Sequence, residues 1–314
     1  MTDNLHGFVV VQHGQTLIER YGEGDDFAWD RPLGHVVFDA GTLHDVRSVT
    51  KSVVALLYGI ALADGHVPEP SAPLLASFPE YPDLAADPAR ARLTVAHALT
   101  MSLGLEWREE IPYSDPANGE IAMDMAPDRN RYVLERPVAG PPGERWAYSG
   151  GASALLGHLI TAGTGRPLRD YARERLFTPL GIGTFEWMAA EDGVFSAASG
   201  LRLTARDLAR VGELVLAGGE GVVPSSWLTE MLTPRLTVEW GDGYGYQWYL
   251  GSVGGRAAPS ALGNGGQRLV VLPSLSAVVA ITAGNYDDPE QWRLPDHLLN
   301  DVALPALTSA THLP

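Results

Sequence analysis

The stretch that most constrains the fold of this chain is Ser48 to Gly65, SVTKSVVALLYGIALADG. Apolar side chains fall on most faces of this segment, which predicts a helix that is surrounded by protein. The Asp64-Gly65 pair at its end is typical of a helix C-terminus. A buried helix of this length requires much of the remaining chain to pack around it.

The same segment begins with the pattern S-x-x-K, formed by Ser48 and Lys51. Residues three apart share one face of a helix, so we expect the two side chains to lie together. Because burial disfavours the charged amine, we expect the pKa of Lys51 to fall below its usual value of about 10.4, which would let it act as a base. A serine hydroxyl needs such a base to become a nucleophile. The alternative is that Ser48 only caps the helix, since S-x-x-K also occurs by chance.

Composition excludes several classes of protein. With 314 residues, 45% of them hydrophobic, the chain predicts a single domain, 1–314, built of closely joined lobes. The absence of cysteine excludes disulfides and thiol nucleophiles. A net charge of −16 argues against nucleic acid or an anionic membrane as a partner. The first residues, MTDNLHGFVVV, do not resemble a signal peptide and no run is long enough to span a membrane, so we predict a cytoplasmic protein.

Strand signals lie at both ends of the chain and helical signals lie in the middle. The simplest architecture is therefore α+β, with one antiparallel sheet built from both chain ends and flanked by helices, plus a mainly helical lobe. We place residues 1–66 with 235–314 in the sheet lobe and residues 67–234 in the helical lobe. The predicted strands are 8–12, 16–21, 244–250, 269–272 and 277–282. The predicted helices, besides the one that begins at Ser48, are 94–100, 149–163, 167–177, 203–217, 225–232 and 294–304. Two long loops are predicted, at 25–43 and 108–131.

Tyr148 stands directly ahead of the second apolar helix, in ERWAYSGG. A tyrosine at a helix entrance can reach a cleft with its hydroxyl, and between two cations its pKa would fall far enough for it to relay a proton. The alternative is a packed aromatic residue whose hydroxyl is hydrogen-bonded, which is the commoner role of tyrosine. The residues alone leave both possibilities open.

Several glycines surround Asn264, in Gly263-Asn264-Gly265-Gly266-Gln267, immediately before a predicted strand. Glycine permits a ligand to approach main-chain N–H groups closely, so this segment can supply a donor that complements the N–H of Ser48 around an oxyanion. A tight hairpin turn explains the same glycines equally well. The nine histidines form no tight metal-binding motif, so we expect neither a metal nor a cofactor.

Taken in order, these segments resemble the serine hydrolases of the penicillin-recognising group, which includes class C β-lactamases, DD-peptidases, related esterases and 6-aminohexanoate-dimer hydrolases. The resemblance covers nearly the whole chain and implies their fold. The matching segments are Arg47 to Ser52, Leu99 to Trp107, Pro142-Gly143 ahead of Tyr148-Ser149, Ala198 to Leu201 with Thr204 to Leu208, and Gly265-Gly266-Gln267.

The resemblance also implies roles for individual residues. Ser48 would be acylated by the substrate, while Lys51 and Tyr148 would shuttle the proton; which of the two is the base stays open. The N–H groups of Ser48 and of either Asn264 or Gly265 would bind the oxyanion, in a loop that continues through Gly266. Two further residues follow more weakly from the resemblance: Tyr113 as a substrate contact and Trp107 as a cleft wall or core residue.

Two departures from the group's pattern bear on the substrate. The Tyr-x-Asn motif corresponds to Tyr148-Ser149-Gly150, which lacks the Asn amide, and Lys-Thr-Gly corresponds to Gly263-Asn264-Gly265, which lacks the cation. A charge-assisted contact contributes a few kcal/mol at most, yet its loss should cost much of the affinity for penicillins. We therefore predict a serine hydrolase acting on a small-molecule ester or amide. The alternatives are a β-lactamase or DD-peptidase, and a catalytically silent binding protein of the same fold; the oligomeric state is left open.

Overall fold

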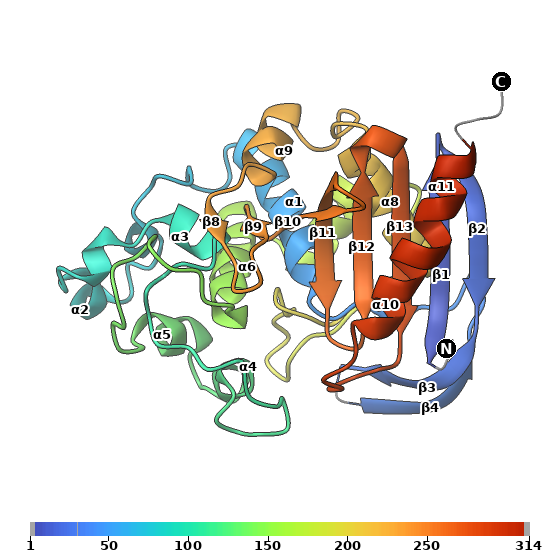
Figure 1. The fold of residues 1–314 in the computed structure, drawn as a ribbon. Helices are drawn as coiled ribbons and strands as arrows, with labels where there is room; N and C mark the ends of the chain where they lie inside the picture. The colour runs from blue at the N-terminus through green and yellow to red at the C-terminus, as the bar shows by residue number, and fades with distance from the viewer. Residues whose placement is uncertain (1–3, 30, 311–314) are drawn as a thin grey trace.

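The two ends of the chain meet in one antiparallel sheet (Figure 1). The structure is a computed structural model that describes residues 4–29 and 31–310; the ends of the predicted domain, 1–3 and 311–314, lie outside these residues. Within the described residues the sheet has eight strands in the order β2-β1-β13-β12-β11-β10-β9-β8. This arrangement confirms the predicted fold class. The strands are β1 (Leu5–Gln12), β2 (Gln15–Tyr21), β8 (Leu236–Thr237), β9 (Gly243–Tyr244), β10 (Tyr249–Val253), β11 (Arg256–Gly263), β12 (Gln267–Leu272) and β13 (Ala277–Ala283).

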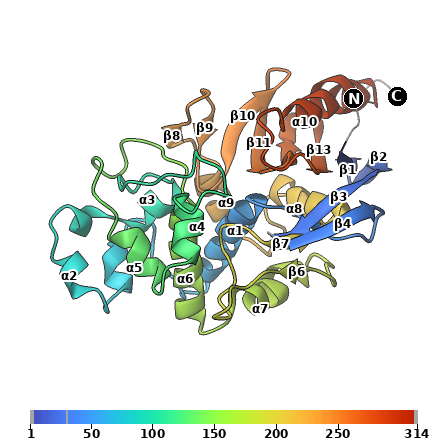
Figure 2. The ribbon, with the colours of Figure 1, turned by 90° about the horizontal axis from the view of Figure 1, so that it is seen from below.

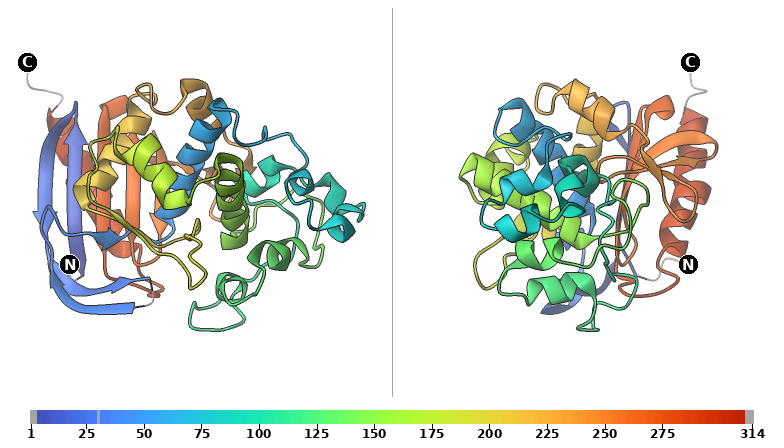
Figure 3. Two further views of the ribbon diagram at one scale, coloured as in Figure 1. Left: turned by 180° about the vertical axis from the view of Figure 1, so that it is seen from behind. Right: turned by 90° about the vertical axis from the view of Figure 1, so that its left-hand side faces the viewer.

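Strand β1 lies between β2 and β13 in this sheet, and it pairs with β13 so that Val10 stands opposite Val279. Successive side chains of a strand point to opposite faces, and here both faces are buried, which explains the unbroken apolar run of β1. Phe8 and Val10 pack with helices α10 and α11, whereas Val9 and Val11 belong to the core that contains α1 and α8. Helices therefore cover both faces of the sheet (Figures 1 and 3).

Helix α1 (Val49–Ala63) lies at the centre of the molecule, as the sequence predicts, with residues from Val49 to Ala61 all buried. The helical region packs against it and includes α6 (Gly150–Thr164), which α1 contacts directly. Side-chain caps start two of the predicted helices: Ser149 Oγ accepts the N–H of Ala152, and Thr204 Oγ1 accepts that of Asp207. The other helices are α2 (Pro82–Ala85), α3 (Val95–Leu99), α4 (Gly119–Asp124), α5 (Arg129–Leu134), α7 (Leu168–Ala172), α8 (Ala205–Leu216), α9 (Ser225–Met231), α10 (Arg293–His297) and α11 (Leu304–Ala310), with single 3-10 or π turns at Leu74–Ser77, Arg90–Arg92, Arg173–Phe177, Pro273–Leu275 and Leu298–Ala303.

The local structure differs from the predictions in four places. The predicted loop 25–43 contains a hairpin of β3 (Glu23–Ala28) and β4 (Arg31–Val37), which lies beneath the main sheet (Figure 2). Strand β3 is rich in acidic residues and β4 contains a proline and a glycine, residue types with little β-propensity, so the sequence pattern does not indicate the hairpin. Strand β11 was not predicted because its sequence, RAAPSALG, contains a proline and mostly small residues. The predicted loop 108–131 contains α4 and the start of α5. The predicted strand 244–250 is divided between β9 and β10. A small third sheet joins β5 (His44–Asp45), β6 (Glu186–Trp187) and β7 (Leu201–Leu203).

The predicted boundaries of the two lobes, between residues 66 and 67 and between residues 234 and 235, stay predictions.

Across residues 4–29 and 31–310, none of the helices combines the length and the apolar character that crossing a membrane would need.

The close packing of α1 gives a testable prediction at Gly59. A Cβ atom there would lie 2.0 Å from Cδ1 of Trp227, whose Nε1 donates to the main-chain oxygen of Ala55 at 2.9 Å. Alanine favours a helix over glycine by about 1 kcal/mol, but overpacking a core costs about 1–3 kcal/mol or more. We expect Gly59→Ala to lower the thermal unfolding midpoint, while Gly183→Ala, where a Cβ meets open space, leaves it unchanged. An unchanged midpoint in Gly59→Ala would show that the indole moves aside without cost.

Candidate active site

Ser48 stands at the N-terminus of α1 and its side chain points toward Lys51. It occupies the N-cap position with φ −68° and ψ −7°, but in the described structure its side chain makes no capping hydrogen bond. Lys51 Nζ instead donates to Ser48 Oγ at 3.0 Å. The preceding residue, Arg47, has φ 50°, and its N–H donates to Asp45 Oδ1 at 2.8 Å, which holds this strained turn. The geometry thus does not match a serine that merely caps a helix.

Lys51 is only 2% exposed, and its ammonium group has three hydrogen-bond acceptors around it. Besides Ser48 Oγ, these are the main-chain oxygen of Ala198 at 2.8 Å and Glu120 Oε2 at 3.5 Å. A charged amine has three N–H donors and a neutral amine has two, so three acceptors suit the ammonium form.

Tyr148 completes the group of residues that the sequence predicted. Lys51 Nζ lies 5.0 Å from the centre of its ring, and Tyr148 lines the same cleft as Ser48. The entrance of α6 therefore brings this tyrosine to the start of α1. The catalytic roles of the three residues remain predictions.

Two buried carboxyl groups next to Lys51 were missed by the sequence analysis. Glu120, on the first turn of α4, accepts a hydrogen bond from Ser199 Oγ at 3.0 Å in addition to its contact with Lys51. Glu109 Oε2 accepts the Trp107 indole N–H at 2.6 Å, and Glu109 Oε1 accepts the Tyr113 hydroxyl at 3.0 Å. Both carboxyl groups came from a region predicted as a polar loop, where nothing distinguishes a buried glutamate from an exposed one.

These carboxyl groups reverse the predicted pKa shifts. Burial pulls the pKa of Lys51 down, but Glu120, Tyr148 and Glu109 outweigh it, so this pKa lies above its ordinary value instead of below it. The pKa of Tyr148 is likewise raised, by burial, against the opposing effect of Lys51. The prediction for Tyr148 assumed two neighbouring cations, whereas the site holds one cation and two carboxyl groups.

The two carboxyl groups themselves titrate differently. Burial and the neighbouring Glu120 raise the pKa of Glu109 to about 7. Burial also acts to raise the pKa of Glu120, but Lys51 and a hydrogen bond from Glu109 bring it below its ordinary value. Below about pH 7 the structure therefore favours an ionised Glu120 and a protonated Glu109.

The loop 263–267 approaches the segment that leads into Ser48. A Cβ at Gly263 would lie 2.5 Å from the main-chain oxygen of Val46, so only glycine allows this approach. Of the two predicted oxyanion donors, the N–H of Gly265 already donates to Gln291 Oε1 at 2.6 Å. The N–H of Asn264 is therefore the better candidate, while Gly266 turns the loop with φ 90°.

A cleft of about 1120 Å³ opens above these groups. The residues that line it include Ser48, Tyr148, Trp107, Tyr113 and Asn264. Exposed carboxyl groups outnumber arginines around it, and aromatic rings form much of the remaining surface. The additional lining residues used below are Glu110, Trp146, Glu239, Trp240, Tyr249, Asp287, Asp288 and Trp292 with Arg145 and Arg268.

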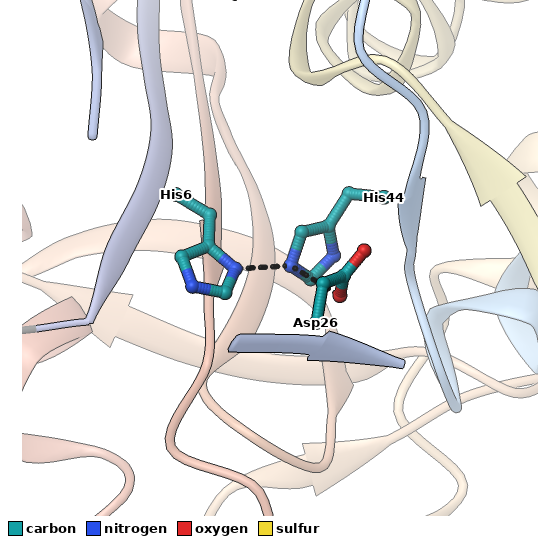
Figure 4. Close-up of side chains that lie close together, drawn as sticks. All are labelled: His6, Asp26 and His44. Atoms are coloured by element: carbon teal, nitrogen blue, oxygen red, sulfur yellow. Dashed lines mark hydrogen bonds and ion pairs between the residues drawn. The ribbon is translucent and has the colours of Figure 1, made fainter. Parts of the chain in front are cut away.

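A second buried cluster lies next to this site, where His6, Asp26 and His44 meet from three strands (Figure 4). Each offers one potential metal ligand atom, and these atoms all lie within 4.8 Å of one another. Their separation in the chain, up to 38 residues, explains why no metal motif was visible in the sequence. Tyr286 Oη donates to Asp26 Oδ1 at 2.9 Å and packs under Gly265, so the cluster supports the glycine loop.

The hydrogen bonds of this cluster fit a structural network better than a metal site. His44 Nδ1 must donate to the main-chain oxygen of Asp45, 2.9 Å away, because a carbonyl only accepts. His44 Nε2 is then the acceptor for His6 Nδ1, at 2.8 Å. Arg202 Nη2 donates to Asp26 Oδ2 at 3.3 Å and already supplies the positive charge that a metal would bring.

Comparison with known families decides the membership of this chain, because the model of the Beta-lactamase family matches residues 6–302. The chain belongs to the Beta-lactamase family. Within this family it is 29% identical over 198 residues to esterase EstB of Burkholderia gladioli, covering 60% of this chain and 48% of EstB, so the match spans about half of that relative. It is 24% identical to the 6-aminohexanoate-dimer hydrolase of Paenarthrobacter ureafaciens, over 94% of this chain and 77% of that one.

Solved structures agree on the fold. EstCE1, a hydrolase with promiscuous acyltransferase activity, superposes with a TM-score of 0.74 at 16% identity, covering 95% of this chain and 94% of EstCE1. The chain is thus a member of the Beta-lactamase family that is similar to esterases and amide hydrolases.

The histidine cluster makes the stability of this family member sensitive to acid. Burial lowers the pKa of His6 from 6.5 to about 4 and that of His44 to about 3. An unfolded chain therefore binds more protons than the folded one below pH 6.5, and the free energy of unfolding should fall as the pH is lowered from 6.5 toward 4, by on the order of 2–4 kcal/mol. Urea unfolding at pH 7 and pH 4.5 measures this loss.

Two variants distinguish the effect of this cluster on stability from the other effects of low pH. His6→Leu removes one of the depressed pKa values and should reduce the difference between the two pH values, although it is less stable at pH 7. His66→Gln, at an exposed histidine, should keep the wild-type difference. An equal difference in wild type and His6→Leu would contradict this assignment.

Proposed function

We propose that this protein is a serine hydrolase that forms an acyl-enzyme on Ser48 and cleaves an ester or a small amide. The observation that supports it is the hydrogen bond from Lys51 Nζ to Ser48 Oγ, beside Tyr148 in the cleft. A catalytically silent binding protein would have no need to bring these three side chains together.

The proposed reaction has two similar halves. Ser48 Oγ attacks the carbonyl carbon, and its proton passes through the pair of Lys51 and Tyr148 to the departing alcohol or amine. The main-chain N–H groups of Ser48 and Asn264 stabilise the oxyanion. Water then attacks the acyl group, gives its proton to the same pair, and releases the acid while Ser48 recovers its hydroxyl.

The charges around the cleft favour substrates without a carboxylate near the reacting carbonyl. Glu110, Glu239, Asp287 and Asp288 line the opening, and Arg268 is already paired with Asp296 at 2.5 Å. Uncharged or amino-bearing esters and amides suit this surface, because a carboxylate would meet like charges. The names of the relatives, an esterase and an amide hydrolase, agree with this class of substrate.

Covalent labelling of the serine tests the proposal. We expect a fluorophosphonate to add one adduct, located by peptide mapping on the Ser48 peptide, and Ser48→Ala to show none. Hydrolysis of p-nitrophenyl butyrate should fall by at least about a hundredfold in the same variant. Intact mass and steady-state rates measure the two effects, and Ser226→Ala, at an exposed serine of α9, is the matched control.

The outcome separates the alternatives. Absence of an adduct on the folded protein would contradict an activated serine and favour the silent binding protein. A long-lived adduct with penicillin on Ser48 and no turnover of esters would instead favour a penicillin-recognising enzyme.

A further inference from the structure

The position that carries asparagine in the Tyr-x-Asn motif is Gly150 in this chain, and the space beside it is filled. An added Cβ at Gly150 would lie 2.4 Å from Glu120 Oε2 and 3.2 Å from Glu109 Oε2. The main-chain N–H of Gly150 also donates to Glu109 Oε2 at 2.6 Å. The two carboxyl groups therefore converge where the missing side chain would have been.

The charges at this point do not balance if both carboxyl groups are ionised. Lys51 pairs with Glu120 at 3.5 Å, whereas Arg129 pairs with Asp124 at 3.7 Å and with Asp192 at 2.7 Å. Two carboxyl groups that converge on one point in a buried site cannot both ionise readily, whereas one proton shared between them leaves a single negative charge opposite Lys51.

We propose that Glu109 and Glu120 are a positioning pair that shares one proton, takes the place of the missing asparagine amide, and holds Lys51 as an ammonium ion against Ser48. This proposal rests on the proposed function for its role in the reaction, but the arrangement itself can be tested without a substrate. When the pair loses its proton, a second negative charge appears beside Lys51 and Tyr148, which makes loss of a proton from either of them harder.

Other titrating groups face the pair and have to be separated from it. They are Lys51 from α1, Tyr148 from the entrance of α6, Tyr113 from the loop before α4, and Asp124 from α4 itself. Burial, with a contribution from Glu120, raises the pKa of Asp124 to about 7, so Asp124→Asn is a necessary control.

The sequence makes a direct measurement possible, because Lys51 is the only lysine among the 314 residues. Protein labelled with 15N-lysine therefore has one Nζ resonance and needs no assignment. We expect this resonance to stay in the ammonium range from pH 5.5 to 9 and to shift with a midpoint near pH 7, where Glu109 titrates. The shift should vanish in Glu109→Gln and persist in Asp124→Asn and in Glu106→Gln, at an exposed glutamate nearby.

A rate measurement distinguishes positioning from a merely structural role. Glu109→Gln mimics the protonated carboxyl group, so the ratio of its fluorophosphonate labelling rate to that of wild type should rise roughly three- to tenfold between pH 6 and pH 8. A structural defect would give a ratio that does not depend on pH.

The outcomes of the two measurements are separable. A wild-type resonance without a shift between pH 6 and 8, or a shift that survives in Glu109→Gln, overturns the shared proton even if Ser48 is labelled. A shift that is present in wild type and lost in Glu109→Gln supports the pair, even if Ser48 proves unreactive and the hydrolase proposal fails.

Discussion

The buried ammonium group of Lys51 is the constraint on which the rest of the site depends. Removing such a charge from water costs several kcal/mol unless acceptors and an opposite charge surround it. Here the acceptors come from three separate places: the start of α1, α4, and the main chain at Ala198. The fold must bring these segments together, and doing so also places Tyr148 beside Ser48.

Close approach of chain segments is the second constraint, and glycines permit it. Gly263 lets the end of β11 reach the main chain at Val46, and Gly150 leaves room for the carboxyl groups of Glu120 and Glu109. Tyr286 connects Gly265 to the cluster of His6, Asp26 and His44 (Figure 4), because its hydroxyl donates to Asp26 and its ring packs under Gly265. Packing around the serine thus involves segments from both ends of the chain and from its middle.

Much of the fold could be predicted from the residues because its signals are local. The apolar periodicity of α1, the caps Ser149 and Thr204, and the apolar strands β1 and β13 each carry their own pattern. The hairpin of β3 and β4 carries little such pattern, since its apolar residues do not alternate regularly and it is held by pairing and by contacts such as that of Asp26 with Arg202. Strand β11 is likewise defined by its neighbours rather than by its own side chains.

By itself, the sequence determined that Ser48 and Lys51 share a helix face, that both chain ends form strands, and that cysteine chemistry is absent. Only the tertiary structure decided the charge of the site. Burial alone would lower the pKa of Lys51. The pKa is raised instead because Glu109 and Glu120 lie close to Lys51 in the fold, although they are 58 and 69 residues away along the chain. Electrostatic effects depend on distance in space, and no local pattern records that distance.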